Sequence, residues 1–217
     1  MIRGLFGQRL YPGTEVAFGQ LCRSVTPELI DESRRAGIRQ LTGFRRGTDV
    51  WFYGEYDSDP RASIARRDEM PAHQGWWHGL RSIVEDASEP ARVVFYDEVF
   101  HTNEGAPLAG PSTRGMLTLA IDPERSDEYD ALHAHPWADL IEALADSGFR
   151  NYSGFRRGPL VVYYGEYYPD MRSVFARMAS HEVDARWGRA FEGIITTIRG
   201  PDGWLLTADE ICHFASR

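Results

Sequence analysis

One histidine in the C-terminal half has neighbours whose types and spacing suit proton-transfer chemistry. Tyr129, His133 and Trp137 recur at every fourth position, which places side chains on one face of a helix. Histidine exchanges protons near neutral pH, while phenols and indoles hold small polar molecules through hydrogen bonds and ring contacts. Tyr152 begins the next predicted strand and can direct its hydroxyl toward His133. We therefore predict His133, Tyr129 and Tyr152 as catalytic residues.

Other kinds of site are less well supported by the spacing. His133 and His135 lie two positions apart, so on a helix their rings point about 200° apart and do not share a metal ion. The sequence has no glycine-rich phosphate loop and no nucleophile elbow. We expect neither a metal nor a cofactor. The structural alternative for the same residues is a core-facing helix stripe with a hydrogen-bonded histidine.

The elements that must position these residues occur twice in the chain. The segment GFRRG begins at Gly43 and again at Gly154, each time followed by YGEY. A shift of 111 residues aligns 3–83 with 114–194 without a gap, and 24 of the 81 aligned pairs are identical. A repeat of this length is a duplicated domain, because solenoid repeats are much shorter. We predict a first repeat over 1–101, a linker over 102–113 and a second repeat over 114–217.

Each repeat has the same predicted order of elements. A strand is followed by a helix, from about 14 to 36 or from 125 to 147, that ends at a glycine. A two-stranded hairpin, a second helical region with Trp76 or Trp187, and a closing strand follow. This βαββαβ order is the ferredoxin-like pattern. We predict the α+β class, with two ferredoxin-like units in tandem that cover each other's open sheet faces.

The repeats differ where the titratable groups lie. The positions of Tyr129, His133 and Tyr152 are occupied in the first repeat by Phe18, Cys22 and Leu41. Gly188 matches Trp77, so we expect open space beside Trp187 in the second repeat. One active pocket is therefore predicted in the second repeat, with a degenerate counterpart in the first.

Composition limits the partners. The net charge of -8 disfavours nucleic acid, whose phosphates require clustered basic residues. The sequence lacks an apolar run long enough to span a membrane and lacks the apolar segment of a signal peptide. Two cysteines are too few for a disulfide scaffold. We expect a cytoplasmic protein with a small-molecule substrate, acting as a monomeric pseudo-dimer, with further oligomerisation left open.

Two segments of the second repeat carry a longer pattern. EYDALHAHPWADLIEALADSGFRNYSGF has a Tyr-x3-His-x3-Trp helix, a glycine and an Asn-Tyr strand, and ARWGRAF follows later. This pattern resembles the L-rhamnose mutarotase family over nearly all of residues 114–214, and the first repeat is similar in outline. The resemblance implies a dimeric α/β barrel of ferredoxin-like subunits, here within a single chain, that interconverts sugar anomers without a cofactor.

The resemblance also implies roles for individual residues. His133 would be the general acid or base, Tyr129 and Tyr152 would hydrogen-bond the pyranose, and Trp187 would form a wall. Trp137 and Asn151 belong to the same motifs and are expected to bind substrate. Anomerisation needs one proton at the ring oxygen while another leaves the anomeric hydroxyl, which suits an imidazole at neutral pH. The predicted enzyme is a mutarotase-type isomerase.

Two other functions stay open. GIRQLTGFRRG and VWFYGEYDSD in the first repeat resemble polyketide cyclases of the same barrel superfamily in fold pattern. Such an enzyme would take a polycyclic metabolite, for which the space at Gly188 is favourable. The third function is a non-catalytic ligand-binding protein, because fold does not decide function.

Overall fold

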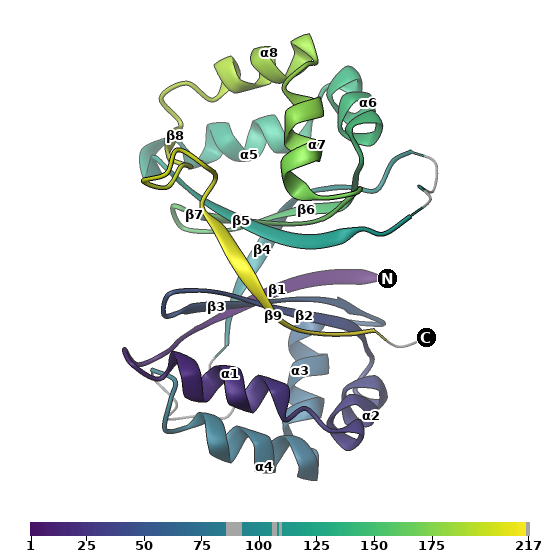
Figure 1. Cartoon of the computed structure of the whole chain (residues 1–217), viewed down its shortest axis with the longest axis vertical. Coiled ribbons are helices and arrows are strands. Elements are labelled where there is room, and N and C mark those ends of the chain that lie inside the picture. Colours follow the sequence, from purple (N-terminus) through teal and green to yellow (C-terminus); the bar gives the residue numbers. More distant parts are fainter. Residues whose placement is uncertain (86–92, 106–107, 109, 216–217) are drawn as a thin grey trace. The chain divides into compact units, whose positions relative to one another are not determined.

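The computed structural model describes residues 1–85, 93–105, 108 and 110–215. They form two compact units, which are described separately (Figure 1). Unit 1 consists of residues 1–96 and 209–217, and unit 2 consists of residues 97–208. Among the described residues, no helix has the length and apolar character needed to cross a membrane.

Unit 1 is an antiparallel sheet whose helices lie on one face (Figure 1). β1 pairs with β3 and β4, and β2 pairs with β3 and β9. Its elements are β1 (Ile2–Arg9), α1 (Glu15–Arg23), α2 (Pro27–Arg35), β2 (Ile38–Arg46), β3 (Asp49–Tyr56), α3 (Pro60–Asp68), α4 (Pro71–Leu80), and parts of β4 (Val94–Thr102) and β9 (Thr207–Ala215).

Unit 2 repeats this arrangement. β6 pairs with β7 and β4, while β5 pairs with β7, with β9 and with a short strand, β8, that the sequence analysis did not predict. Its elements are β5 (Thr113–Ile121), the 3-10 turn η1 (Pro123–Arg125), α5 (Ser126–Ala134), α6 (Ala138–Ser147), β6 (Phe149–Arg157), β7 (Leu160–Tyr167), α7 (Met171–Met178), α8 (Glu182–Ala190) and β8 (Ile195–Thr197).

The closing strand of each repeat completes the unit of the other repeat. From Asp97 onward β4 pairs with β6 in unit 2, and from Asp209 onward β9 pairs with β2 in unit 1. Strand pairing runs in the order β7-β6-β4-β1-β3-β2-β9-β5, and β5 also pairs with β7. This order confirms the predicted fold class, tandem ferredoxin-like units of an α/β barrel.

The predicted division into a first repeat over 1–101, a linker over 102–113 and a second repeat over 114–217 stays a prediction. Residues 106, 107 and 109 of the expected linker over 102–113 lie outside the described residues. The same holds for residues 86–92 of the first repeat and 216–217 of the second.

Each long predicted helix is in fact two helices. In unit 2 the chain leaves the helical conformation at His135, with φ −135° and ψ 62°, and α6 starts after Trp137. Pro136 explains the break, because proline lacks an amide hydrogen and excludes the helical conformation at the preceding residue. Pro27 follows the corresponding break in unit 1. The expectation that Trp137 shares one helix face with His133 is therefore wrong.

Glycines end the helical regions and form the hairpin turns, as predicted. Gly37 and Gly148 follow α2 and α6 with φ of 84° and 98°, a conformation that favours glycine. Gly47 and Gly158 turn the two GFRRG hairpins with φ of 58° and 54°. Each unit buries its own apolar core between its helices and its sheet.

Candidate functional site

Unit 2 contains a cavity of about 500 Å³ between its helices and its sheet, called the unit 2 cavity. Every residue that lines it belongs to unit 2. The lining is mostly aromatic and aliphatic, the composition typical of small-molecule pockets. The candidate functional side chains among its lining residues are Tyr129, His133, Tyr152, Tyr163, Asp184 and Trp187.

A chain of hydrogen bonds connects two tyrosines to the imidazole. Nδ1 of His133 lies 3.0 Å from the backbone carbonyl oxygen of Tyr129, which can only accept, so Nδ1 carries the proton. Nε2 then accepts from the Tyr163 hydroxyl at 2.5 Å. The Tyr163 oxygen in turn accepts from the Tyr129 hydroxyl at 2.6 Å. The chain therefore runs from Tyr129 through Tyr163 to a basic nitrogen.

Burial determines the protonation of this chain. It lowers the pKa of His133 to about 4, although the hydrogen bond to the Tyr129 carbonyl acts in the opposite direction. It raises the pKa of Tyr163 and Tyr152 well above the usual value for tyrosine. At neutral pH the imidazole is an uncharged acceptor and the phenols are protonated donors. The arrangement can therefore move a proton from the cavity toward Nε2 of His133.

Tyr152 lies in the cavity, but it does not form the contact with His133 that the sequence suggests. Its ring stacks on Tyr163 with 5.2 Å between centroids, and its hydroxyl has no hydrogen-bond partner among the described residues. Tyr152 is 9 % exposed, whereas Tyr129 is fully buried. Both tyrosines line the cavity, but only the Tyr129 hydroxyl is engaged by Tyr163.

The predicted substrate-binding residues lie in different environments. Trp187 lines the cavity, with its ring 5.7 Å from that of His133. Trp137 packs behind it in an edge-to-face contact at 5.1 Å and does not line the cavity. Asn151 occupies an irregular position of β6 with φ 45°, and its side chain donates to Glu166 at 3.4 Å. Of these three, only Trp187 lies beside the histidine.

Two cavity residues were missed by the sequence analysis. Tyr163 replaces Phe52 of the first repeat, and Asp184 replaces His73, so both lie where the repeats differ. The criterion that selected His133 would have found them. Burial raises the pKa of the Asp184 carboxyl above its usual value, so it too is suited to hold a proton.

The glycine at the start of the second GFRRG segment, Gly154, is required by a close approach of the Tyr163 ring. A Cβ at this position would lie 2.7 Å from the ring of Tyr163, its partner across β6 and β7. The glycine therefore leaves room for the phenol that contacts His133.

Gly188 lies beside open space, since a Cβ there would meet no atom within 4 Å. The predicted open space beside Trp187 is confirmed.

Comparison with known proteins gives the same picture of fold and repeat. Among solved structures, a candidate monooxygenase from Fusobacterium nucleatum is 10 % identical, covers 98 % of this chain and 93 % of its own, and has a TM-score of 0.59. A candidate monooxygenase from Lactobacillus acidophilus is 5 % identical, with coverages of 99 % and 95 % and a TM-score of 0.61. At these identities the likeness shows the fold alone.

An L-rhamnose mutarotase from Formosa agariphila is 18 % identical, covers 48 % of this chain and 100 % of its own, and has a TM-score of 0.39. No curated protein matches the sequence. The family model of L-rhamnose mutarotase matches twice, over residues 3–102 and over residues 114–214. Since these two matches fall on the two repeats and together span most of the chain, the protein belongs to the L-rhamnose mutarotase family and contains its unit twice.

Proposed function

We propose that unit 2 is a cofactor-independent, mutarotase-type isomerase that interconverts the anomers of a sugar. The observation that supports this most directly is the hydrogen-bond chain ending at Nε2 of His133 inside the unit 2 cavity. Family membership supports a sugar substrate and an isomerase. The larger cavity and the bonded Tyr129–Tyr163–His133 chain favour unit 2, rather than unit 1, as the catalytic unit.

The reaction requires two coordinated proton transfers. The anomeric hydroxyl gives its proton to the Tyr163 oxygen, while Tyr163 gives its own proton to Nε2 of His133. The ring C–O bond breaks, and the ring oxygen takes a proton from the Tyr152 hydroxyl. The open-chain aldehyde rotates, recloses on its other face and returns both protons. General acid-base catalysis of this kind is worth roughly 10² to 10⁴ in rate.

The cavity also offers suitable surfaces for a sugar. Trp187 and Phe191 present ring faces and edges beside the imidazole, and the apolar face of a pyranose packs well against such rings. Asp184 and the Tyr152 hydroxyl can bind sugar hydroxyls on the polar side.

The test uses His133→Ala and its matched control Cys22→Ala, at the equivalent position of the first repeat. Saturation-transfer NMR measures the exchange between the anomers of L-rhamnose and of other deoxysugars. We expect the wild type to accelerate exchange, His133→Ala to lose at least about 10²-fold, and Cys22→Ala to keep the wild-type rate. If the wild type accelerates no deoxysugar, the proposal is wrong.

One observation favours a second candidate, an enzyme acting on a polycyclic aromatic metabolite. Gly188 lines the cavity, no atom lies within 4 Å of a Cβ placed there, and the lining is mainly apolar. The same proton chain could then act on a phenol or an enolisable ketone. Tight binding of a tricyclic hydroxyanthraquinone, together with no effect on sugar anomers, would favour this alternative.

A further inference from the structure

Unit 1 has its own cavity, of about 310 Å³, called the unit 1 cavity. Its walls are largely apolar and include Phe6, Phe52, Leu80, Trp76 and Trp77. Buried Ser33, Arg67 and His73, from α2, α3 and α4, interrupt this apolar lining, and they are 2 %, 7 % and 7 % exposed. Glu32, which is 4 % exposed, does not line the cavity but is bonded to His73. The other polar residues of the lining are Gln8, Arg23 and His213.

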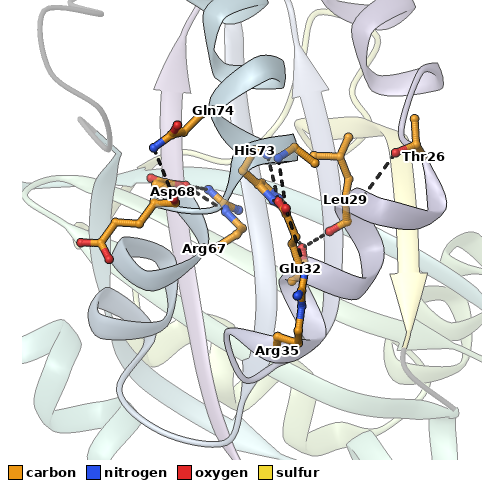
Figure 2. A network of polar contacts seen from close by, with 11 residues as sticks. Thr26, Leu29, Glu32, Arg35, Arg67, Asp68, His73 and Gln74 are labelled. Carbon is orange, nitrogen blue, oxygen red and sulfur yellow. Dashed lines mark hydrogen bonds and ion pairs between the residues drawn. The ribbon is translucent and has the colours of Figure 1, made fainter.

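The carboxylate of Glu32 holds the His73 ring in place (Figure 2). Its Oε2 accepts from Nδ1 of His73 at 3.0 Å and from the His73 amide at 3.0 Å, while Oε1 accepts from the Ala72 amide at 3.0 Å. Burial would raise the pKa of Glu32, but these hydrogen bonds lower it below its usual range. Glu32 is therefore charged, and the proton of the imidazole is on Nδ1.

Nε2 of His73 is left with an available lone pair. Burial and the charge of Arg67 lower the pKa of His73 to about 4, so the ring is neutral and Nε2 can only accept. Ser33 lies 3.4 Å from Nε2, but its single hydroxyl proton is better placed on the Leu29 carbonyl, at 2.9 Å. His73 and Ser33 both line the cavity, so this acceptor lies where a ligand can reach it.

The fold itself does not require this polar group. The second repeat has Ala143, Leu144, Met178 and Asp184 at the positions of Glu32, Ser33, Arg67 and His73. Unit 2 nevertheless forms the corresponding helices, and α8 begins without any side-chain cap. Burying a carboxylate is costly unless it is fully bonded, so an apolar set would pack unit 1 at least as well. Packing therefore does not explain the polar residues of unit 1, and we look to ligand binding for their role.

We propose that the unit 1 cavity is a second ligand site, in which Nε2 of His73, oriented by Glu32, accepts a hydrogen bond from a hydroxyl group of an uncharged, largely apolar aromatic molecule. The apolar walls require a mainly hydrocarbon ligand. The charge of Arg67 is already paired with Asp68 at 2.7 Å, so the cavity does not need an anion. The ligand must bring a donor, because Nε2 can only accept.

A pair of probes separates the donor from the ring system. 2-Naphthol has the hydroxyl group, while 2-methoxynaphthalene has the same rings and oxygen without a donor. We expect the full-length protein to bind 2-naphthol about five- to tenfold more tightly, the effect of one hydrogen bond. In protein with ¹⁵N-labelled histidine, 2-naphthol should shift the Nε2 signal of His73, whereas 2-methoxynaphthalene should not. This NMR titration needs no substitution.

Two variants extend the test. His73→Phe keeps a ring but removes the acceptor, so it should bind both probes equally. Ser33→Ala retains His73 and should keep the preference for 2-naphthol. Equal affinity of the wild type for both probes, no binding of 2-naphthol, or a shift of the His133 signal alone would overturn the proposal. None of these readouts involves sugar anomers, so their outcome is independent of the isomerase activity proposed for unit 2.

Discussion

The two cavities have equivalent backbones but place their titratable groups on different walls. In unit 2 the imidazole is His133 on α5, opposite Asp184 on α8. In unit 1 the equivalent positions are Cys22 and His73, so the helices carry their imidazole in the second helical region instead, and His213 on β9 also lines the cavity. In unit 2 a tyrosine contacts Nε2, whereas in unit 1 a carboxylate contacts Nδ1. A few substitutions on one scaffold therefore move the basic nitrogen from one helix to another.

The cavities also differ in size for an identifiable reason. Trp77 fills part of unit 1, whereas Gly188 leaves the equivalent space in unit 2 open. The volumes of about 310 and 500 Å³ agree with this difference. We therefore expect the two units to bind ligands of different size and polarity.

The largest effect on the anomerisation rate is expected when Tyr163, the phenol next to His133, is replaced by the residue that unit 1 has at this position. Tyr163→Phe introduces the residue of the first repeat, Phe52, and removes the hydroxyl that connects the cavity to Nε2. The anomerisation rate should fall by about 10²-fold, because the proton loses its path. The matched reverse change, Phe52→Tyr in unit 1, should leave the rate unchanged. A Tyr163→Phe variant with the wild-type rate would contradict the role of the hydrogen-bond chain.

Acid should destabilise both units through their buried histidines. His73 and His133 have a pKa of about 4 in the fold, compared with about 6.5 when unfolded. Between these values the unfolded chain binds more protons, so the free energy of unfolding should fall as the pH is lowered from 6.5 to 4, by about 2 kcal/mol per histidine. Urea denaturation across this pH range measures it. His73→Gln and His133→Gln should each remove part of the fall, and an unchanged pH dependence in both would contradict the prediction.

Filling the open space in unit 2 should make its cavity more like that of unit 1. Gly188→Trp introduces the residue of the first repeat and should weaken binding of a tricyclic aromatic probe by about tenfold or more, since the ring takes up the volume that the probe needs. Isothermal titration calorimetry measures the change. Gly188→Ala is the control, because it should leave ligand binding intact and stabilise α8 by about 0.5 to 1 kcal/mol. Unchanged binding to Gly188→Trp would show that this space is not used.

The smallest effect concerns the two thiols of unit 1, one of which, Cys22, stands at the position of His133. The interaction between the Cys22 and Cys212 thiols raises the pKa of the buried Cys22 and lowers that of the more exposed Cys212. Cys212 should therefore react several-fold faster with iodoacetamide, as followed by peptide mass spectrometry. Cys22→Ala removes the thiol that lowers the pKa of Cys212 and should slow this reaction. Faster labelling of Cys22 would contradict the assignment.

Much of the fold and part of the site could be predicted from the sequence because those features depend on local chemistry. The repeat, the glycine turns and the alternation of strands and helices follow from residue types at fixed spacing. His133 and Tyr152 stand out because the repeats differ at their positions, and Trp187 stands out because both repeats have a tryptophan there. All three line one cavity. The break at Pro136 is also encoded locally, because proline disfavours the helical conformation at the residue before it.

Only the tertiary structure decided which distant side chains meet. Tyr163 on β7 approaches His133, Glu32 on α2 holds His73 on α4, and Cys212 reaches Cys22. The last contact exists because β9 completes the unit of the other repeat, and no spacing along the chain records such an exchange. Local propensity determines which elements form, whereas long-range packing determines which residues share a cavity and hence where a proton can go.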